Sequence, residues 1–277
     1  MKTLKDHTLI YDKDCPMCCA YTSAFVKTGV LDNKGREPFK HALFPNNPQF
    51  NAHKAKNEIA LLNRKTGEVK YGIDSMFTVM EHAAPVLKPL FRFKPFKWFM
   101  KKVYSFISYN RKVIAPPPKN PTDIQCTPDV NLKYRWMYII FAVLMAGVLS
   151  GIGVGSMYKL EEGLGFALMV TVIVILRLIL QALVARGLDD KTKTLDYLGN
   201  LVTVNMQLAV LVCLAFISAR IPNIEGALAT AILLIASIYA IAIHLKRLKS
   251  LGMTPFLCLA WNLQWALIVG ITALLWG

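Results

Sequence analysis

Hydrophobic and polar positions divide this sequence into two unlike parts. Up to about residue 135, apolar residues occur in short groups separated by polar residues and turn signals. Beyond that point come long apolar stretches, each close to the ~20 residues that cross the hydrocarbon core of a bilayer. They cover residues 137–158, 164–184, 198–219, 227–245 and 255–276. The pattern predicts a soluble domain followed by an all-α transmembrane domain of about five helices.

The first part alternates between strand-like and helix-like patterns. A helix is expected from Pro16 to about residue 31, because proline is favoured at the first helical position. A second helix is expected from Asp74 or Ser75 to about His82. Strands are predicted over 8–11, 39–44, 58–63 and 68–71, with 64–67 turning the last two into a hairpin. This order predicts a small α/β layer of the thioredoxin-like kind.

Residues 88–114 alternate basic and aromatic side chains, and Phe96, Phe99, Val103, Phe106 and Ile107 share one helical face. Two interpretations stay open: a helix lying in the membrane interface, or an amphipathic helix that closes the soluble domain. A proline-rich segment follows. We expect three regions: a domain over 1–114, a linker over 115–135 and a helical transmembrane domain over 136–277.

Charge follows the same division. The net charge of +15 and the hydrophobic content of 55% rarely occur together in one soluble domain. The first 135 residues hold 23 of the 32 Lys and Arg, and they are about a quarter charged, against about a tenth for the rest. The composition excludes a fully soluble protein, a secreted disulfide scaffold and a disordered chain.

Positive residues also predict an orientation. One set of membrane-flanking segments holds eight (Lys133, Arg135, Arg186, Lys191, Lys193, Lys246, Arg247, Lys249) and the opposite set holds two (Lys159, Arg220). By the positive-inside rule the N-terminal domain is cytoplasmic and the C-terminus lies on the far side. The N-terminus shows no secretory signal pattern. We expect an integral membrane protein of the bacterial inner membrane whose basic residues meet lipid headgroups rather than nucleic acid.

The strongest chemical signal is a cysteine pair spaced i and i+3 at a predicted helix start. Unpaired backbone N–H groups would stabilise a Cys15 thiolate, whereas Cys18, one turn along, should be more buried. This assigns Cys15 as the attacking and Cys18 as the resolving thiol, exchanging through a mixed disulfide with a protein or small-molecule substrate. Asp12 and Asp14 either oppose the thiolate or act as cap and proton acceptor.

Cys19 extends the motif and allows a second interpretation. It is expected to pack in the core as a small hydrophobe. Alternatively, it is a third soft ligand for Cu(I) or Zn(II), helped by His41 or His53, in a membrane transport or metal-handling protein. The redox interpretation needs no cofactor and no metal.

The motif resembles the DCC family of thiol-disulfide oxidoreductases, a thioredoxin-like group. The shared features are Asp12-x-x-Cys15-Pro16-x-Cys18, the step at residues 71–75 before a helix, and the Asn110-Arg111 pair. Lys13 departs from the glycine usual after the signature acid. The resemblance covers about residues 7–114 and implies a redox role for Cys15 and Cys18, with Asp12 as the signature acid and Pro16 within the motif.

Arg177 is the candidate of interest in the membrane domain. No acidic residue lies within a predicted span, so a buried arginine there faces a cavity, backbone carbonyls or an anionic ligand. Gly147, Gly151 and Gly155 form a stripe of small residues that permits close helix packing. Cys213 and Cys258 stand alone in their spans and are expected to be packing residues.

Overall fold

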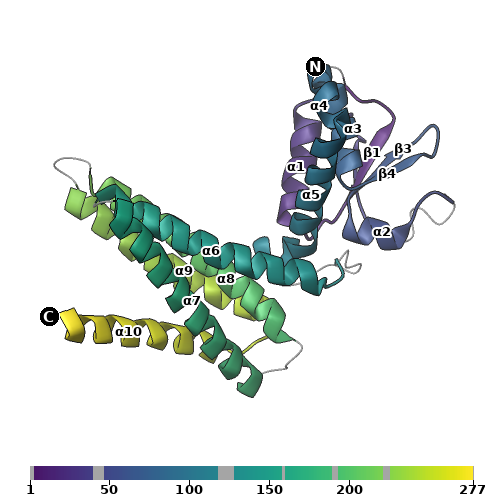
Figure 1. Ribbon diagram of the computed structural model, residues 1–277. Coiled ribbons are helices and arrows are strands. Elements are labelled where there is room, and N and C mark those ends of the chain that lie inside the picture. Colours follow the sequence, from purple (N-terminus) through teal and green to yellow (C-terminus); the bar gives the residue numbers. More distant parts are fainter. Residues whose placement is uncertain are drawn as a thin grey trace. The chain divides into compact units, whose positions relative to one another are not determined.

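The computed structural model describes residues 3–39, 47–117, 128–157, 160–188, 193–220 and 225–276 (Figure 1). It divides into two compact units, Met1–Arg135 and Trp136–Gly277. The strand expected over 39–44 falls largely outside the described residues, as do residues 118–127 of the linker expected over 115–135, whose last four residues begin a helix.

The first unit is built on a four-stranded mixed sheet in the order β2-β1-β3-β4. Its strands are β1 (His7–Tyr11), β2 (Arg36–Pro38), β3 (Ala60–Asn63) and β4 (Val69–Tyr71). Strand β1 pairs parallel with β2 and antiparallel with β3, whereas β3 and β4 form the antiparallel hairpin that the sequence predicts. Strand β2 begins three residues before the segment expected to hold the second strand.

Alternating residues of the sheet bury two different faces. Leu9, Tyr11 and Leu61 pack in one hydrophobic cluster with α1 (Pro16–Lys27), α3 (Ile73–Ala83) and α5 (Lys94–Ile114), through residues that include Cys18, Val79 and Tyr104. Ile10 and Ala60 point the other way, toward Ala55 of α2 (Ala52–Asn57). Helices therefore cover both faces, as a thioredoxin-like α/β domain requires.

Several helix boundaries differ from the expectation. Helix α1 ends at Lys27 rather than near residue 31, and Gly29 follows with φ +72°. Helix α3 begins at Ile73, after Gly72, which adopts φ 60° and ψ −133°. Helix α2 has no apolar periodicity to announce it, and the Asn51 side chain caps it by accepting a hydrogen bond from the Lys54 N–H.

The stretch at 88–114 is divided into α4 (Lys88–Arg92) and α5, with a short 3-10 turn, η1 (Pro85–Leu87), before them. Helix α5 closes the domain, because the Tyr104 hydroxyl accepts a hydrogen bond from the Ile59 N–H at 2.9 Å. Its buried face differs from the predicted one, since Phe99 is 56% exposed. Phe93, which lies between α4 and α5, and Trp98 of α5 are also exposed, so this stretch presents aromatic rings to its surroundings.

The second unit is all-helical and consists of α6 (Leu132–Met157), α7 (Leu160–Leu188), α8 (Thr194–Ser218), α9 (Glu225–Leu251) and α10 (Phe256–Trp276). Among the described residues, four helices, α6 to α9, are long and apolar enough to cross a membrane, and the part of α10 with described side chains is apolar but shorter. The glycine stripe packs as expected: a Cβ on Gly151 would lie 2.6 Å from the Gly163 carbonyl oxygen of α7.

Candidate active site at the start of helix α1

Cys15 occupies the N-cap of α1, where a helix has unpaired N–H groups. Its Sγ accepts a hydrogen bond from the Cys18 N–H at 3.4 Å. Pro16 fills the first helical position, which needs no N–H partner. Strand β1 ends at Tyr11, so the cysteine motif occupies the turn between the sheet and the helix. This placement is the one that the sequence predicts.

The surroundings separate the acidities of the two thiols. Hydrogen bonds from the Cys18 side chain and N–H, together with the nearby Arg111 guanidinium, lower the pKa of Cys15 to about 7. Burial and the Asp12 carboxylate act against this decrease. The hydrogen bond to Cys15, followed by burial, raises the pKa of Cys18 far above its usual value. At neutral pH one thiol is therefore about half ionised and its neighbour is protonated.

Both cysteines of the pair, Cys15 and Cys18, are buried. Cys15 is 4% exposed and Cys18 is 8% exposed, so the expectation that Cys18 is the more buried of the two is not met by exposure. The N-terminal position of Cys15 does not bring it to the surface, because Tyr11 and Val79 belong to the same packed cluster. A substrate must therefore reach the sulfur through a recess or a small movement.

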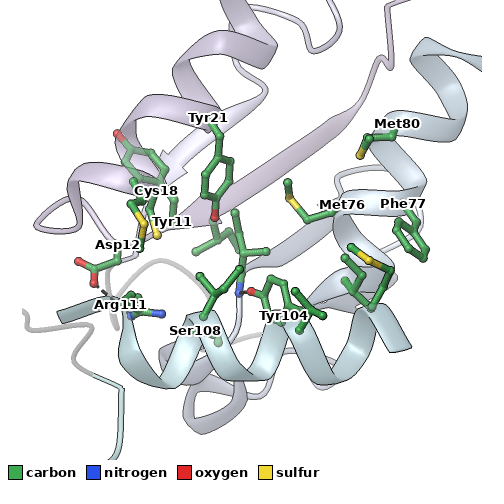
Figure 2. A pocket seen from close by; sticks show the side chains of 18 of the residues that line it. Tyr11, Asp12, Cys18, Tyr21, Met76, Phe77, Met80, Tyr104, Ser108 and Arg111 are labelled. Carbon is green, nitrogen blue, oxygen red and sulfur yellow. Dashed lines mark hydrogen bonds and ion pairs between the residues drawn. The ribbon is translucent and has the colours of Figure 1, made fainter. Parts of the chain in front are cut away.

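Arg111 joins the site from the last turn of α5. Its Nη2 donates to Asp12 Oδ2 at 3.1 Å and to the Lys56 carbonyl at 3.1 Å. The pair is well shielded, with side-chain exposures of 7% for Arg111 and 11% for Asp12 (Figure 2). Burial raises the pKa of Asp12, and the charge of Arg111 opposes that rise. One cation therefore acts on both the acid and the thiolate.

Asp12 also shapes the turn that carries the cysteines. Its Oδ1 accepts a hydrogen bond from the Asp14 N–H at 3.0 Å, and its carbonyl accepts one from the Cys15 N–H at 3.2 Å. The Asp12 carboxylate thus has two effects: its charge opposes the Cys15 thiolate, and its hydrogen bond stabilises the local turn. Asp14 takes part through its backbone N–H.

Cys19 lies on another side of the helix. Its half-buried thiol donates to the Lys13 carbonyl at 3.2 Å and packs at the edge of the core. Burial raises the pKa of Cys19, which keeps it a neutral thiol. Among the described residues, no three His, Cys, Asp or Glu side chains are grouped to hold a metal ion. His53 pairs with Asp129 instead, and His41 lies outside the described residues.

Arg177 belongs to the helical unit and has partners there. Its Nη2 donates to the Trp261 carbonyl at 2.9 Å, and its guanidinium lies 4.1 Å from the ring centre of Trp265. Of the environments predicted for Arg177, the structure shows a backbone carbonyl, with aromatic faces added. These contacts join α7 to α10, which supports a packing role.

Sequence reasoning did not include Arg111 among the site residues, although the Asn110-Arg111 pair carries part of the family resemblance. Asn110 is fully buried and donates to the Phe106 and Tyr134 carbonyls, so it fixes the turn in which Arg111 lies. The signal available in the sequence was that the helix around Arg111 contains no acidic residue. A buried arginine there must find a partner elsewhere in the fold.

Comparison with known proteins agrees with this geometry. Residues 9–115 match the family model described as DCC1-like thiol-disulfide oxidoreductase. No curated protein and no solved structure gave a match. The matched segment contains the cysteine pair, Asp12 and Arg111, and it ends one residue after α5. Residues 9–115 are therefore similar to DCC1-like thiol-disulfide oxidoreductases, and the chain continues into a helical region whose described residues hold four candidate membrane spans.

Proposed function

We propose that this protein is a membrane-anchored thiol-disulfide oxidoreductase in which Cys15 attacks and Cys18 resolves. The observation that carries the proposal is the Cys15 sulfur itself, capped by the Cys18 N–H and with its pKa lowered to about 7. Attack needs a thiolate, and a pKa near the ambient pH gives both a thiolate fraction and high nucleophilicity.

The reaction proceeds in two exchanges. The Cys15 thiolate attacks one sulfur of a substrate disulfide, forms a mixed disulfide and releases the other sulfur as a thiolate, which takes a proton from water. Cys18 then attacks the Cys15 sulfur and closes the protein disulfide, and the departing substrate sulfur takes the Cys18 proton. The substrate gains two electrons and the protein loses two. A disulfide- or thiol-containing protein or small molecule can serve as the partner.

The test is trapping of the mixed disulfide. In the full-length protein, Cys18→Ala should accumulate a mixed disulfide on Cys15 that mass spectrometry detects, whereas the unchanged protein should show a Cys15–Cys18 disulfide after mild oxidation. Cys19→Ala is the matched control, because that thiol is adjacent but has a raised pKa. Absence of both adducts, with Cys15 alkylating no faster than free cysteine, would refute the proposal.

We also propose that the DCC1-like domain faces the cytoplasm, in the inner membrane of a bacterium. The excess of positive residues on one set of membrane-flanking segments supports this orientation. In that compartment thiols are kept reduced, so the cysteine pair would cycle between states rather than rest as a permanent disulfide.

A further inference from the structure

A cavity of about 430 Å³ lies beside Cys18 in the N-terminal unit. Residues of α1, α3 and α5 and the end of β1 form most of its wall, with single residues from α2 and α4, and Cys18 is part of that wall. Its size lies within the ~300–1,000 Å³ usual for small-molecule sites. The redox chemistry described above makes no use of this space.

The two ends of the cavity differ in chemistry. Figure 2 shows Cys18, Asp12 and Arg111 at one end and Met76, Phe77 and Met80 of α3 at the other. One end therefore carries sulfur and charge, whereas the other is apolar. A ligand that fits both has a reactive or polar head and an apolar body.

Two polar side chains in the middle of the cavity wall bind the backbone. The Tyr104 hydroxyl accepts from the Ile59 N–H, and the Ser108 hydroxyl donates to the Asn57 carbonyl. Four methionines line the walls, and this side chain adapts its shape to different apolar partners. They are Met17, Met76, Met80 and Met100.

We propose that this cavity holds the apolar arm of a lipophilic small-molecule disulfide, which makes such compounds the substrate class of the enzyme. The inference rests on the proposed thiol exchange. With one arm in the cavity, the substrate passes Cys18, whose N–H lies 3.4 Å from the Cys15 sulfur. Cys18 lines the cavity and Cys15 is buried next to it, so a small molecule in the cavity lies against the cysteine motif, whereas a folded protein cannot enter a space of this size.

The two exchanges proceed in the same order when the apolar arm of the substrate is bound in the cavity. The Cys15 thiolate attacks the sulfur that carries the bound arm, and the outer half leaves as a thiolate that water protonates. Cys18 then attacks the Cys15 sulfur, and the bound half leaves as a thiol carrying the Cys18 proton. The protein supplies both electrons, so one turnover of the reduced protein needs no other reductant.

The test compares alkyl chain lengths in single turnover. The reduced full-length protein would react with S-alkyl 2-pyridyl disulfides bearing methyl, butyl or octyl chains, followed by the absorbance of the released pyridine-2-thione. The octyl reagent should react at least about tenfold faster than the methyl reagent, since each buried methylene adds about 0.8 kcal/mol. Met100→Trp, which fills the cavity, should remove most of that preference.

Phe99→Trp is the matched control, because residue 99 is adjacent on α5 but exposed. It should keep the chain-length preference. The reagents partition into lipid to the same extent with every variant, so a difference between variants in the octyl-to-methyl rate ratio reports binding in the cavity. Equal chain-length ratios in the unchanged protein and Met100→Trp would overturn the proposal. Circular dichroism spectra and thermal unfolding midpoints should be the same in all three proteins, which shows that each is folded.

A second measurement separates this inference from the proposed function. Octyl methyl sulfide has no disulfide to exchange, yet it should protect amides of α3 and α5 from hydrogen exchange in the unchanged protein and not in Met100→Trp. Protection with unreactive cysteines would refute the thiol exchange alone. Reactive cysteines without protection or chain-length preference would refute the cavity's role alone.

Discussion

Arg111 is 99 positions away from Asp12 in sequence, and the two still form a shielded ion pair beside the cysteines. At this residue scale, hydrogen bonds from Cys18 and two opposite charges act on one sulfur. The hydrogen bonds from Cys18 contribute most to lowering the pKa of Cys15 to about 7; Arg111 also lowers it, and Asp12 raises it. Changing either charged partner should therefore shift this pKa in a direction set by the sign of the lost charge.

Asp12→Asn should lower the pKa of Cys15 below about 7, because it removes a negative charge that opposes the thiolate. The asparagine oxygen can still accept the Asp14 N–H, so the turn is kept. At pH 6 about a tenth of a thiol of pKa 7 is ionised, and the variant should alkylate about threefold faster there. The pH profile of Cys15 alkylation by iodoacetamide measures this shift.

The control is the alkaline limit, where Cys15 is fully ionised in both proteins and the rates should converge. A midpoint that moves upward in Asp12→Asn would contradict the assignment of Asp12 as the opposing charge. It would mean instead that loss of the pair with Arg111 disturbs the site.

At the scale of elements, the cysteine-bearing helix and α3 begin with different devices. Helix α1 uses a sulfur cap and a proline, which local sequence announces. Helix α3 begins after Gly72, whose φ of 60° and ψ of −133° are disfavoured for any residue with a side chain. Ser75 fastens that turn by donating to the Lys70 carbonyl at 2.6 Å. Residue 72 is therefore a glycine because the backbone conformation at this turn disfavours a side chain.

Gly72→Ala should destabilise the N-terminal domain by about 1–3 kcal/mol, the usual cost of a strained backbone conformation. The added Cβ would also lie 2.6 Å from Glu58 Oε2. Gly29→Ala is the matched control: it has φ +72° but no atom within 4 Å of the added Cβ, so it should lose less. Denaturant-dependent exposure of the buried Cys18 thiol in the full-length protein gives both values. Equal losses would indicate that crowding at Gly72 contributes nothing.

Sequence predicted the elements whose signals are local and missed those that depend on distant contacts. The strand ending at Tyr11, the proline start of α1 and the hairpin of β3 and β4 were confirmed. Helix α2 was missed because its core contact, Ala55, is a single small residue. Arg111 was missed as a site residue because its partner lies at the other end of the domain. The buried face of α5 depends on partners such as Ile59, which helical periodicity alone cannot identify.

At the scale of the whole molecule, the chain joins a charged redox domain to an apolar helical unit. The helical unit holds its cations by packing: Arg177 contacts the Trp261 carbonyl, and Arg247 donates to the Asn200 side-chain oxygen at 2.8 Å. Two of the eight positive residues that predict the orientation, Arg135 and Arg247, are buried within α6 and α9. The remaining positive residues still favour the same side.

The location of the C-terminus tests how many helices cross the membrane. If α6 to α10 all cross, a reporter fused after residue 277 should be on the opposite side from one fused at the N-terminus. A pair of enzymes active only in the cytoplasm or only outside it, fused in turn to each end, measures this. Both ends on the same side would show that α10 does not span and that the four longer helices are the membrane domain.

The sulfur cap of α1 has a thermodynamic consequence for the whole protein. The Cys18 N–H, the helix start and Arg111 favour a charge on Cys15 that exists only while the protein is reduced. Closing the proposed disulfide would remove that charge and leave those groups without their anion. The reduced fold should then be more resistant to heat than the oxidised fold, and the cysteine pair should pass its disulfide on readily. Redox state would in this way become a factor in conformational stability, with the reduced protein as the more stable form.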